Sequence, residues 1–129
     1  TEGAVGELHR VLRKGGVAKV MLYHRNSLNY WVEIILRRGL LRGQLFRGQS
    51  PEQIMSRCVE YSGHNAEPLV KVYSRREARS LFKLFSEVEV EVDQMMREEL
   101  RVFRHAIPES LFRALRRRVG WNVIITAKK

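Results

Sequence analysis

The segment 87–92 alternates without exception between glutamate and valine. Because successive side chains of a β-strand point to opposite faces, this pattern predicts a strand with one wet face and one apolar face. Such a strand fits the edge of a sheet whose other side is packed against the rest of the protein. The chain must therefore supply neighbouring strands and a layer that covers the valines.

Two other segments predict the remaining strands of that sheet. Residues 17–24 form a short, mostly apolar run directly after Gly15 and Gly16, which is typical of a buried strand entered from a helix. Residues 121–127 are rich in β-branched side chains, which favours a second buried strand. A short extended piece is expected at 69–73.

Helix start signals occupy the intervals between the strands. The predicted helices begin after Ser27, Ser50, Ser74 and Pro108, and the pairs Ser50/Gln53 and Ser74/Glu77 have the spacing of a capping box. A helix is also expected before Gly15, with Leu8, Val11 and Leu12 on one face. The helix from Ser74 to Phe85 has its apolar side chains on one face as well. Trp31, Leu111 and Val11 are expected to face inward, and residues 40–48 are expected to form a loop.

Composition limits the class of protein. The 129 residues suit one domain, and no apolar run approaches the roughly 20 residues that span a bilayer. The first residues lack the pattern of a signal peptide, so a cytoplasmic location with no membrane partner is expected. The single cysteine, Cys58, offers no internal disulfide, and no two histidines have metal-ligand spacing on one element, so no metal is expected.

The net charge of +10 favours an anionic partner. The arginines are spread through every segment, and many lie opposite apolar helix faces, which favours a solvated surface over a nucleic-acid patch. For Arg113 and Arg116 to Arg118, a phosphate-binding helix is the alternative to the outer face of an amphipathic helix.

The order of these elements resembles the C-terminal half of a class I S-adenosylmethionine-dependent methyltransferase of the type 11-like kind. Residues 3–16, with the sequence Arg-Val-Leu, two basic residues and Gly-Gly at their end, resemble the helix before the family's fifth strand. Residues 17–23 are similar to that fifth strand, 73–85 to the last helix, 88–92 to the sixth strand and 120–128 to the terminal strand.

The resemblance implies an α/β fold that is the C-terminal portion of a Rossmann-like methyltransferase. The sheet would be small and mixed, ordered 5-7-6, with an antiparallel edge and covering helices. Residues 1–129 would form a single, partial domain that lacks the N-terminal cofactor-binding half, and residues 25–72 a helical insertion after the first strand. The chain would be a methyltransferase fragment, inactive alone, whose parent methylates a small molecule.

S-adenosylmethionine is the family's cofactor, but the glycine-rich loop that binds it is not found here. Gly15 and Gly16 follow a helix rather than a strand, and Gly39, Gly43 and Gly48 are too widely spaced. The resemblance therefore places the cofactor site before Thr1 or on a separate chain. This chain alone is not expected to bind the cofactor.

The family's acceptor contacts commonly follow the fifth strand, which makes five residues the candidates for substrate binding: Tyr23, His24, Arg25, Asn26 and Tyr30. His24 can accept a substrate proton or serve as a structural histidine at a strand end, and both alternatives stand. Arg25 suits an anionic group, and Tyr30 suits an aromatic one. No catalytic residue is assigned, and His64 and Asn65 are a weaker pair of candidates.

A missing half would leave the edge of strand 17–23 unpaired and apolar, so we expect a homodimer formed through that edge. Two other functions remain as alternatives. One is a basic module that binds nucleic acid, and the other is a structural subunit that completes a separate cofactor-binding chain.

Overall fold

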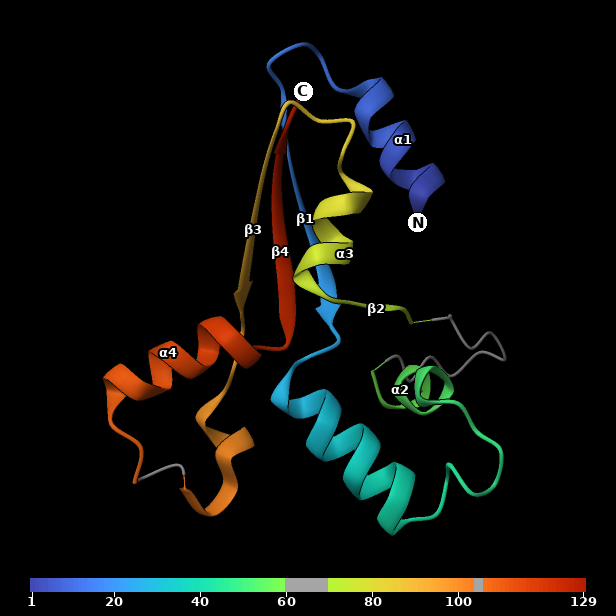
Figure 1. The fold of residues 1–129 in the computed structure, drawn as a ribbon, viewed down its shortest axis with the longest axis vertical. Coiled ribbons are helices and arrows are strands. Elements are labelled where there is room, and N and C mark those ends of the chain that lie inside the picture. Colours follow the sequence, from blue (N-terminus) through green and yellow to red (C-terminus); the bar gives the residue numbers. More distant parts are fainter. Residues whose placement is uncertain (60–69, 104–105) are drawn as a thin grey trace.

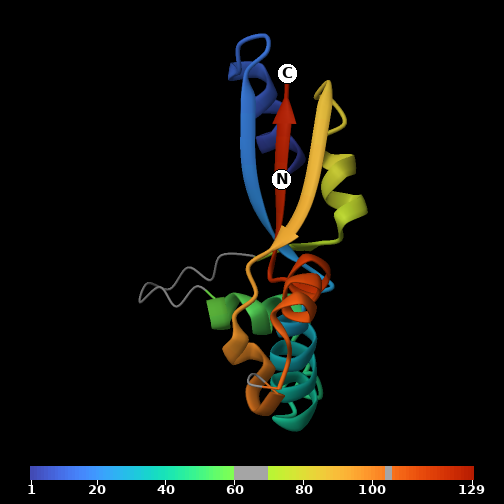
Figure 2. The ribbon, with the colours of Figure 1, turned by 90° about the vertical axis from the view of Figure 1, so that its left-hand side faces the viewer.

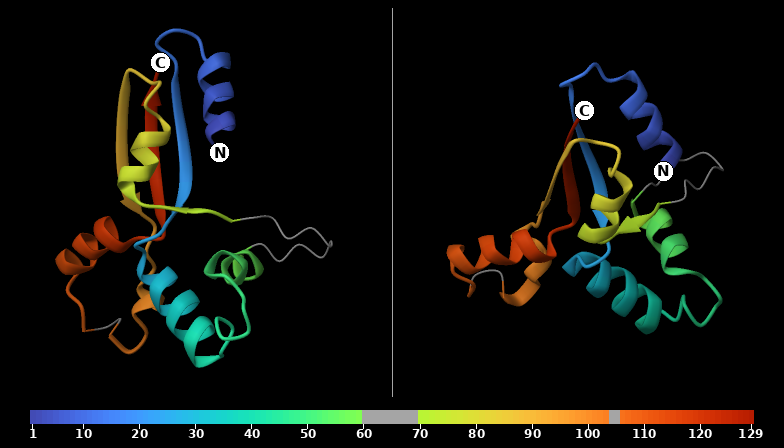
Figure 3. Two further views of the ribbon diagram at one scale, coloured as in Figure 1. Left: turned by 45° about the vertical axis from the view of Figure 1, so that its right-hand side comes forward. Right: turned by 45° about the horizontal axis from the view of Figure 1, so that its top comes forward.

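The computed structural model describes residues 1–59, 70–103 and 106–129. In chain order these form α1 (Glu2–Val11), β1 (Val17–His24), a π-helix η1 (Tyr30–Leu41), α2 (Pro51–Val59), β2 (Val72–Tyr73), α3 (Arg75–Leu81), β3 (Glu87–Asp93), a 3-10 helix η2 (Arg97–Phe103), α4 (Glu109–Val119) and β4 (Asn122–Lys128). The sheet, with α1 and α3, occupies one end of the molecule, and η1, α2, η2 and α4 occupy the other (Figures 1 and 3).

The four strands form one mixed sheet in the order β2-β1-β4-β3. β4 is antiparallel to both neighbours, pairing from Val17↔Lys128 to Tyr23↔Asn122 with β1 and from Glu87↔Lys128 to Asp93↔Asn122 with β3. β2 is parallel to β1. The expected mixed α/β sheet is confirmed, and the alternating glutamate-valine segment lies at its edge.

One face of this sheet carries the main core. Val88, Val90 and Val92 pair in register with Ala127, Ile125 and Val123, so all six side chains share a face. α1 and α3 cover that face, and Phe82 and Ala78 are fully buried there. Figure 2 shows the opposite face, where the strands stand in front of α1. The glutamates of β3 are exposed on that face, as their alternation predicts.

Lys129, directly after β4, contacts the end of α1 and the turn that leads into β1. The Lys129 ammonium group donates to the carbonyl oxygens of His9 and Leu12 at 2.6 and 2.8 Å. These carbonyls belong to the last turn of α1, whose acceptors have no partner within the helix. Gly15, at φ +74°, makes the turn into β1, and its amide donates to the Lys129 carbonyl at 2.9 Å.

The helical end has a second core, in which η1 packs against α2. Tyr30, Ile34, Ile54 and Met55 are buried there with Val72 of β2. The predicted caps form: the Ser27 hydroxyl accepts from the Tyr30 amide at 3.1 Å. Ser50 and Gln53 likewise bond reciprocally at 3.2 and 2.8 Å. No helix in the described part of the chain is long and apolar enough to cross a membrane.

Several side chains do not lie where their spacing predicted. The helix predicted to end at Gly39 continues to Leu41, so the predicted loop begins too early. Trp31 was expected in the core but is 54% exposed, because the wider π-helical turn directs Tyr30, Ile34 and Gly39 inward instead. Val11, at the last turn of α1, is 65% exposed, and Leu111 is 50% exposed, so both inward predictions are wrong.

Replacing Gly120 with alanine should destabilise the fold strongly. A Cβ atom at this position would lie 2.4 Å from the Asp93 carbonyl oxygen and 2.5 Å from that of Arg116. Both atoms belong to the backbone and cannot rotate away, so we expect a loss of about 2 to 3 kcal/mol in the free energy of unfolding. Urea unfolding measures the loss.

The matched control is Gly3→Ala, because a Cβ atom at Gly3 meets nothing within 4 Å and the residue lies in α1. The control should gain about 0.5 to 1 kcal/mol, since alanine favours a helix over glycine. Equal stability of Gly120→Ala and the native chain would contradict the close approach of α4 to β3.

Candidate functional site

The parallel strands β1 and β2 end side by side, and the chain leaves both at the same edge. Tyr23 pairs with Val72 and His24 with Tyr73. The Arg25 amide then donates to the Tyr73 carbonyl at 2.9 Å, which extends the pairing by one residue. In open α/β sheets, ligands bind beyond the carboxyl ends of parallel strands. This edge is therefore the candidate site.

The Arg25 side chain is held in place by two groups, one on α3 and one on β2. Its guanidinium lies 2.9 Å from the Glu77 carboxylate and donates to the Val72 carbonyl at 3.3 Å. Both side chains of the ion pair are nearly half exposed, so the pair contributes at most about 1 kcal/mol to stability. Its main effect is to fix the direction of the guanidinium.

Glu77 itself is fixed by the capping box that begins α3. The Ser74 amide donates to the Glu77 carboxylate at 2.7 Å, and the Glu77 amide donates to the Ser74 hydroxyl at 3.2 Å. These bonds with Ser74 lower the pKa of Glu77, and the nearby Arg25 lowers it further. The carboxylate is therefore ionised at neutral pH and places a fixed negative charge beside the guanidinium.

Two adjoining hollows flank this ion pair. One, of about 490 Å³, lies between α1 and α3, and the other, of about 550 Å³, lies between the start of α1, β2 and the start of α2. Together they form what we call the β1-end cleft. Four residues line both parts: Glu2, Arg25, Tyr73 and Leu81. The Tyr73 hydroxyl lies 2.7 Å from the Thr1 hydroxyl oxygen within it.

The cleft mixes charges of both signs with an apolar wall. Glu52 and Lys71 line its second part, whereas Lys83, Val5 and Leu84 line the first. Such a lining suits a small molecule that has both polar and apolar parts. No cluster of three or more metal-binding side chains exists among residues 1–59, 70–103 and 106–129.

His24 is a predicted substrate contact that the structure buries. Its side chain is 3% exposed, and its Nδ1 lies 3.1 Å from the Gly120 carbonyl oxygen, to which it donates as the neutral tautomer. Burial lowers the pKa of His24, the bond to Gly120 opposes this shift, and nearby Arg75 adds to it. A neutral histidine that joins β1 to the loop before β4 matches the structural alternative for this residue.

The other four predicted residues lie in different surroundings. Arg25 lines the cleft, whereas Asn26 is exposed and is not among the residues that line it. Tyr23 is half-buried with its ring edge against Trp121, at a centroid distance of 5.6 Å. Tyr30 is buried in the helical core, where burial, then Glu52, raises the pKa of its phenol. The substrate-binding assignments stay predictions, and His64 and Asn65 lie outside the described residues.

Tyr73 and Glu77 are site residues that the sequence alone did not single out. Each belongs to a pattern that the sequence shows: Tyr73 to the short extended segment and Glu77 to the capping box of Ser74. Neither pattern predicts the parallel pairing of β2 with β1, and this pairing brings Tyr73 and Glu77 close to Arg25. That pairing joins segments separated by the whole predicted insertion.

Two of the four arginines of α4 have an acidic side chain nearby. Arg116 lies 2.8 Å from the Asp93 carboxylate, and Arg113 lies 3.9 Å from Glu109. Arg117 and Arg118 line a shared hollow with Glu91 and Asp93. This mixed charge fits the outer face of an amphipathic helix better than a phosphate track.

Comparison with protein-family models, with curated proteins and with solved structures finds no match to this chain.

Burial of neutral His24 should make the stability of the fold depend on pH. Its pKa is lower in the folded chain than the ordinary value of 6.5, so the unfolded chain binds the proton more readily. Stability is then complete above pH 6.5 and falls as the pH drops below that value. Urea unfolding at pH 7.5 and at about pH 5.5 should show this loss.

In His24→Gln, the side-chain amide does not titrate, and the loss between these two pH values should shrink. The native chain, unfolded at the same two pH values, is the reference for this comparison. An unaltered pH dependence in His24→Gln would contradict the buried neutral state.

Proposed function

We propose that this chain is the C-terminal part of a class I S-adenosylmethionine-dependent methyltransferase that acts on a small molecule, and that it forms the acceptor side of the active site. The observation that carries the proposal is the strand order. The last strand, β4, lies antiparallel between β1 and β3, which supports the 5-7-6 arrangement that the family resemblance implies. α1 and α3 on the same sheet face support it further.

The described residues do not fit the cofactor. β1 is followed by Arg25 and β2 by Ser74, so neither parallel strand leads into a glycine-rich loop. The first turn of α3 already receives the Glu77 carboxylate, which would repel an anionic group at that helix end. The cofactor site is therefore assigned to residues before Thr1 or to a separate chain, and no step of the reaction is derived through it.

The part of the chain that we assign to the acceptor is the β1-end cleft. Methyl transfer depends on orientation and on a shielded site, both of which a protein supplies without covalent chemistry of its own. Arg25, fixed by Glu77, would orient a polar group of the acceptor, and Leu81 and Val5 would contact its apolar part. The Tyr73 hydroxyl, which lies 2.7 Å from the Thr1 hydroxyl oxygen, would offer the acceptor a further hydrogen bond.

Calorimetric titration with S-adenosylmethionine and S-adenosylhomocysteine tests whether the cofactor site lies outside this chain. The chain alone should show no binding heat, because its glycines do not form a cofactor loop. A longer protein that adds the residues encoded before Thr1 should bind both compounds. Binding by the chain alone, or failure of the longer protein to bind, would contradict the proposal.

In the longer protein, Arg25→Ala should weaken acceptor turnover and leave cofactor affinity unchanged, because Arg25 belongs to the acceptor side. Arg10→Ala is the matched control, since Arg10 pairs with Glu7 on the surface of α1, away from the cleft lining. Equal effects of the two substitutions would remove Arg25 from the site.

We also propose that the isolated chain forms a homodimer through the edge of β1. β2 pairs only with Tyr23 and His24, so within the described residues 17–22 have no strand on that side. Val17 and Met21 on this strand are each 56% exposed. An apolar edge with free backbone groups is a site for strand pairing.

Light scattering should give twice the 15.2 kDa mass of one chain. Charges on an edge strand oppose pairing, so Val17→Lys combined with Met21→Lys should give monomers. Leu111→Lys, which changes an exposed side chain of α4, should remain dimeric. A monodisperse native monomer would contradict this proposal and would leave the methyltransferase assignment intact.

A further inference from the structure

The turn that follows η1 presents an aromatic side chain to solvent. Its backbone is closed by hydrogen bonds, including Leu45 N–H to Gly39 O at 3.1 Å and Arg47 N–H to Gly43 O at 3.2 Å. Gly43 and Gly48 adopt positive φ, which lets the chain reverse tightly. The turn is thus ordered by its own backbone.

Leu45 and Phe46 take opposite directions from this turn. Leu45 packs into the helical core, so close to Gly39 that a Cβ atom there would lie 2.7 Å from a Leu45 methyl carbon. The neighbouring Phe46 is consequently held outward and is 80% exposed. An exposed aromatic side chain indicates a binding surface when exposed apolar neighbours extend it into a patch.

η1 extends this exposed apolar surface. In a π-helix the backbone bonds join residues five apart, so Trp31, Leu36 and Leu41 recur along one side. They are 54%, 48% and 76% exposed, and Leu40 is 45% exposed. The buried side of the same helix carries Tyr30, Ile34 and Gly39. η1 therefore has two apolar sides, of which only one is covered by the described part of the chain.

The charged side chains that flank Leu41 and Phe46 in the sequence are positive. Between Glu33 and Glu52 the sequence contains four arginines and no acidic residue: Arg37, Arg38, Arg42 and Arg47. Arg37 and Arg38 lie 2.6 and 3.1 Å from the Glu33 carboxylate. Arg42 and Arg47 are exposed on either side of Phe46. We call Trp31, Leu36, Leu40, Leu41 and Phe46 together with Arg42 and Arg47 the lobe-tip surface.

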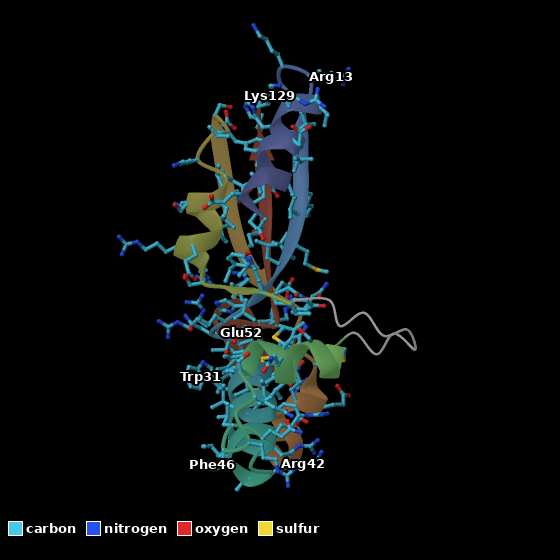
Figure 4. All side chains as sticks on the ribbon, turned by 90° about the vertical axis from the view of Figure 1, so that its right-hand side faces the viewer. Arg13, Trp31, Arg42, Phe46, Glu52 and Lys129 are labelled. Atoms are coloured by element: carbon cyan, nitrogen blue, oxygen red, sulfur yellow. The ribbon has the colours of Figure 1, made fainter. Side chains whose placement is uncertain are left out.

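The lobe-tip surface lies at the opposite end of the molecule from Arg13 and Lys129 (Figure 4). In that view Trp31 and Phe46 lie along the same side of the helical end, and Arg42 lies at its tip. No residue of this surface lines the β1-end cleft. The surface is thus separate from the proposed acceptor site.

Leucine, phenylalanine and tryptophan beside exposed Arg42 and Arg47 match the chemistry of an anionic lipid surface. A second copy of the same surface would set arginines against arginines, which opposes self-association. Three of the five apolar side chains are leucines, which offer no stacking platform to nucleic-acid bases, so only Trp31 and Phe46 could serve in that way. We propose that the lobe-tip surface docks peripherally on anionic membranes, with Phe46, Leu41 and Trp31 at the headgroup boundary and Arg42 and Arg47 at lipid phosphates.

Peripheral docking requires no spanning helix. The expectation of no membrane partner rested on the absence of a spanning run, and the proposal revises it only for surface contact. It is independent of the methyltransferase assignment.

Co-sedimentation with vesicles tests the proposal. The native chain should sediment with phosphatidylcholine vesicles in which about a third of the lipid is replaced by phosphatidylglycerol, and far less with phosphatidylcholine alone. Arg42→Gln combined with Arg47→Gln should weaken binding roughly fivefold per arginine, or about 30-fold together. Leu41→Ser combined with Phe46→Ser should weaken it at least about tenfold, because the apolar contact is lost.

The control combines Val11→Ser and Arg13→Gln, which remove one exposed apolar side chain and one arginine from the opposite end. This variant should bind as the native chain does. Equal losses in the control and the lobe-tip variants would show that the overall charge of +10 drives the binding, and would overturn the proposal. If the native chain sediments with neither kind of vesicle, the proposal is overturned too. That result is expected if the surface binds a protein or a nucleic acid instead.

Discussion

The antiparallel pairing of β4 with both of its neighbours is the constraint on which the rest of the structure depends. β1 and β3 do not pair with each other, so β4 alone joins them into one sheet. Its inward side chains, Val123, Ile125 and Ala127, are fully buried. The pairing with β1 closes a loop of about a hundred residues, whose entropic cost is met only when the whole strand is in place. The sheet core is therefore complete only when β4 has paired with both β1 and β3.

This constraint also determines where the two surfaces that we propose to be functional lie. The loop that leads into β4 receives the His24 imidazole at the Gly120 carbonyl, which fixes the end of β1 and directs Arg25 toward Glu77. β1 then continues into η1, whose inner side joins the helical core and whose outer side is left exposed. The β1-end cleft and the lobe-tip surface are thus formed by consecutive segments but face different surroundings. The β1-end cleft suits the small acceptor molecule that we propose, and the lobe-tip surface suits the anionic membrane that we propose.

The sequence was informative where a pattern depends on local geometry. Alternation predicted β3 as an edge strand, and the capping box of Ser74 predicted the start of α3. Both follow from a few neighbouring residues and need no knowledge of distant contacts. The π-helix was not predictable in this way, because α-helical spacing put Trp31 on the inner face. The site was predicted only in part, since the approach of Tyr73 to Arg25 requires pairing between β1 and β2 across a long connection.

Interstrand nuclear Overhauser effects test the central position of β4 most directly. The account predicts backbone effects that join Ile125 to Val20 on one side and Ile125 to Val90 on the other, since these residues are paired in register. It predicts no direct backbone effect between Val20 and Val90. Effects that join β1 directly to β3, with Ile125 in contact with only one strand, would contradict the strand order and with it the argument for the half-domain.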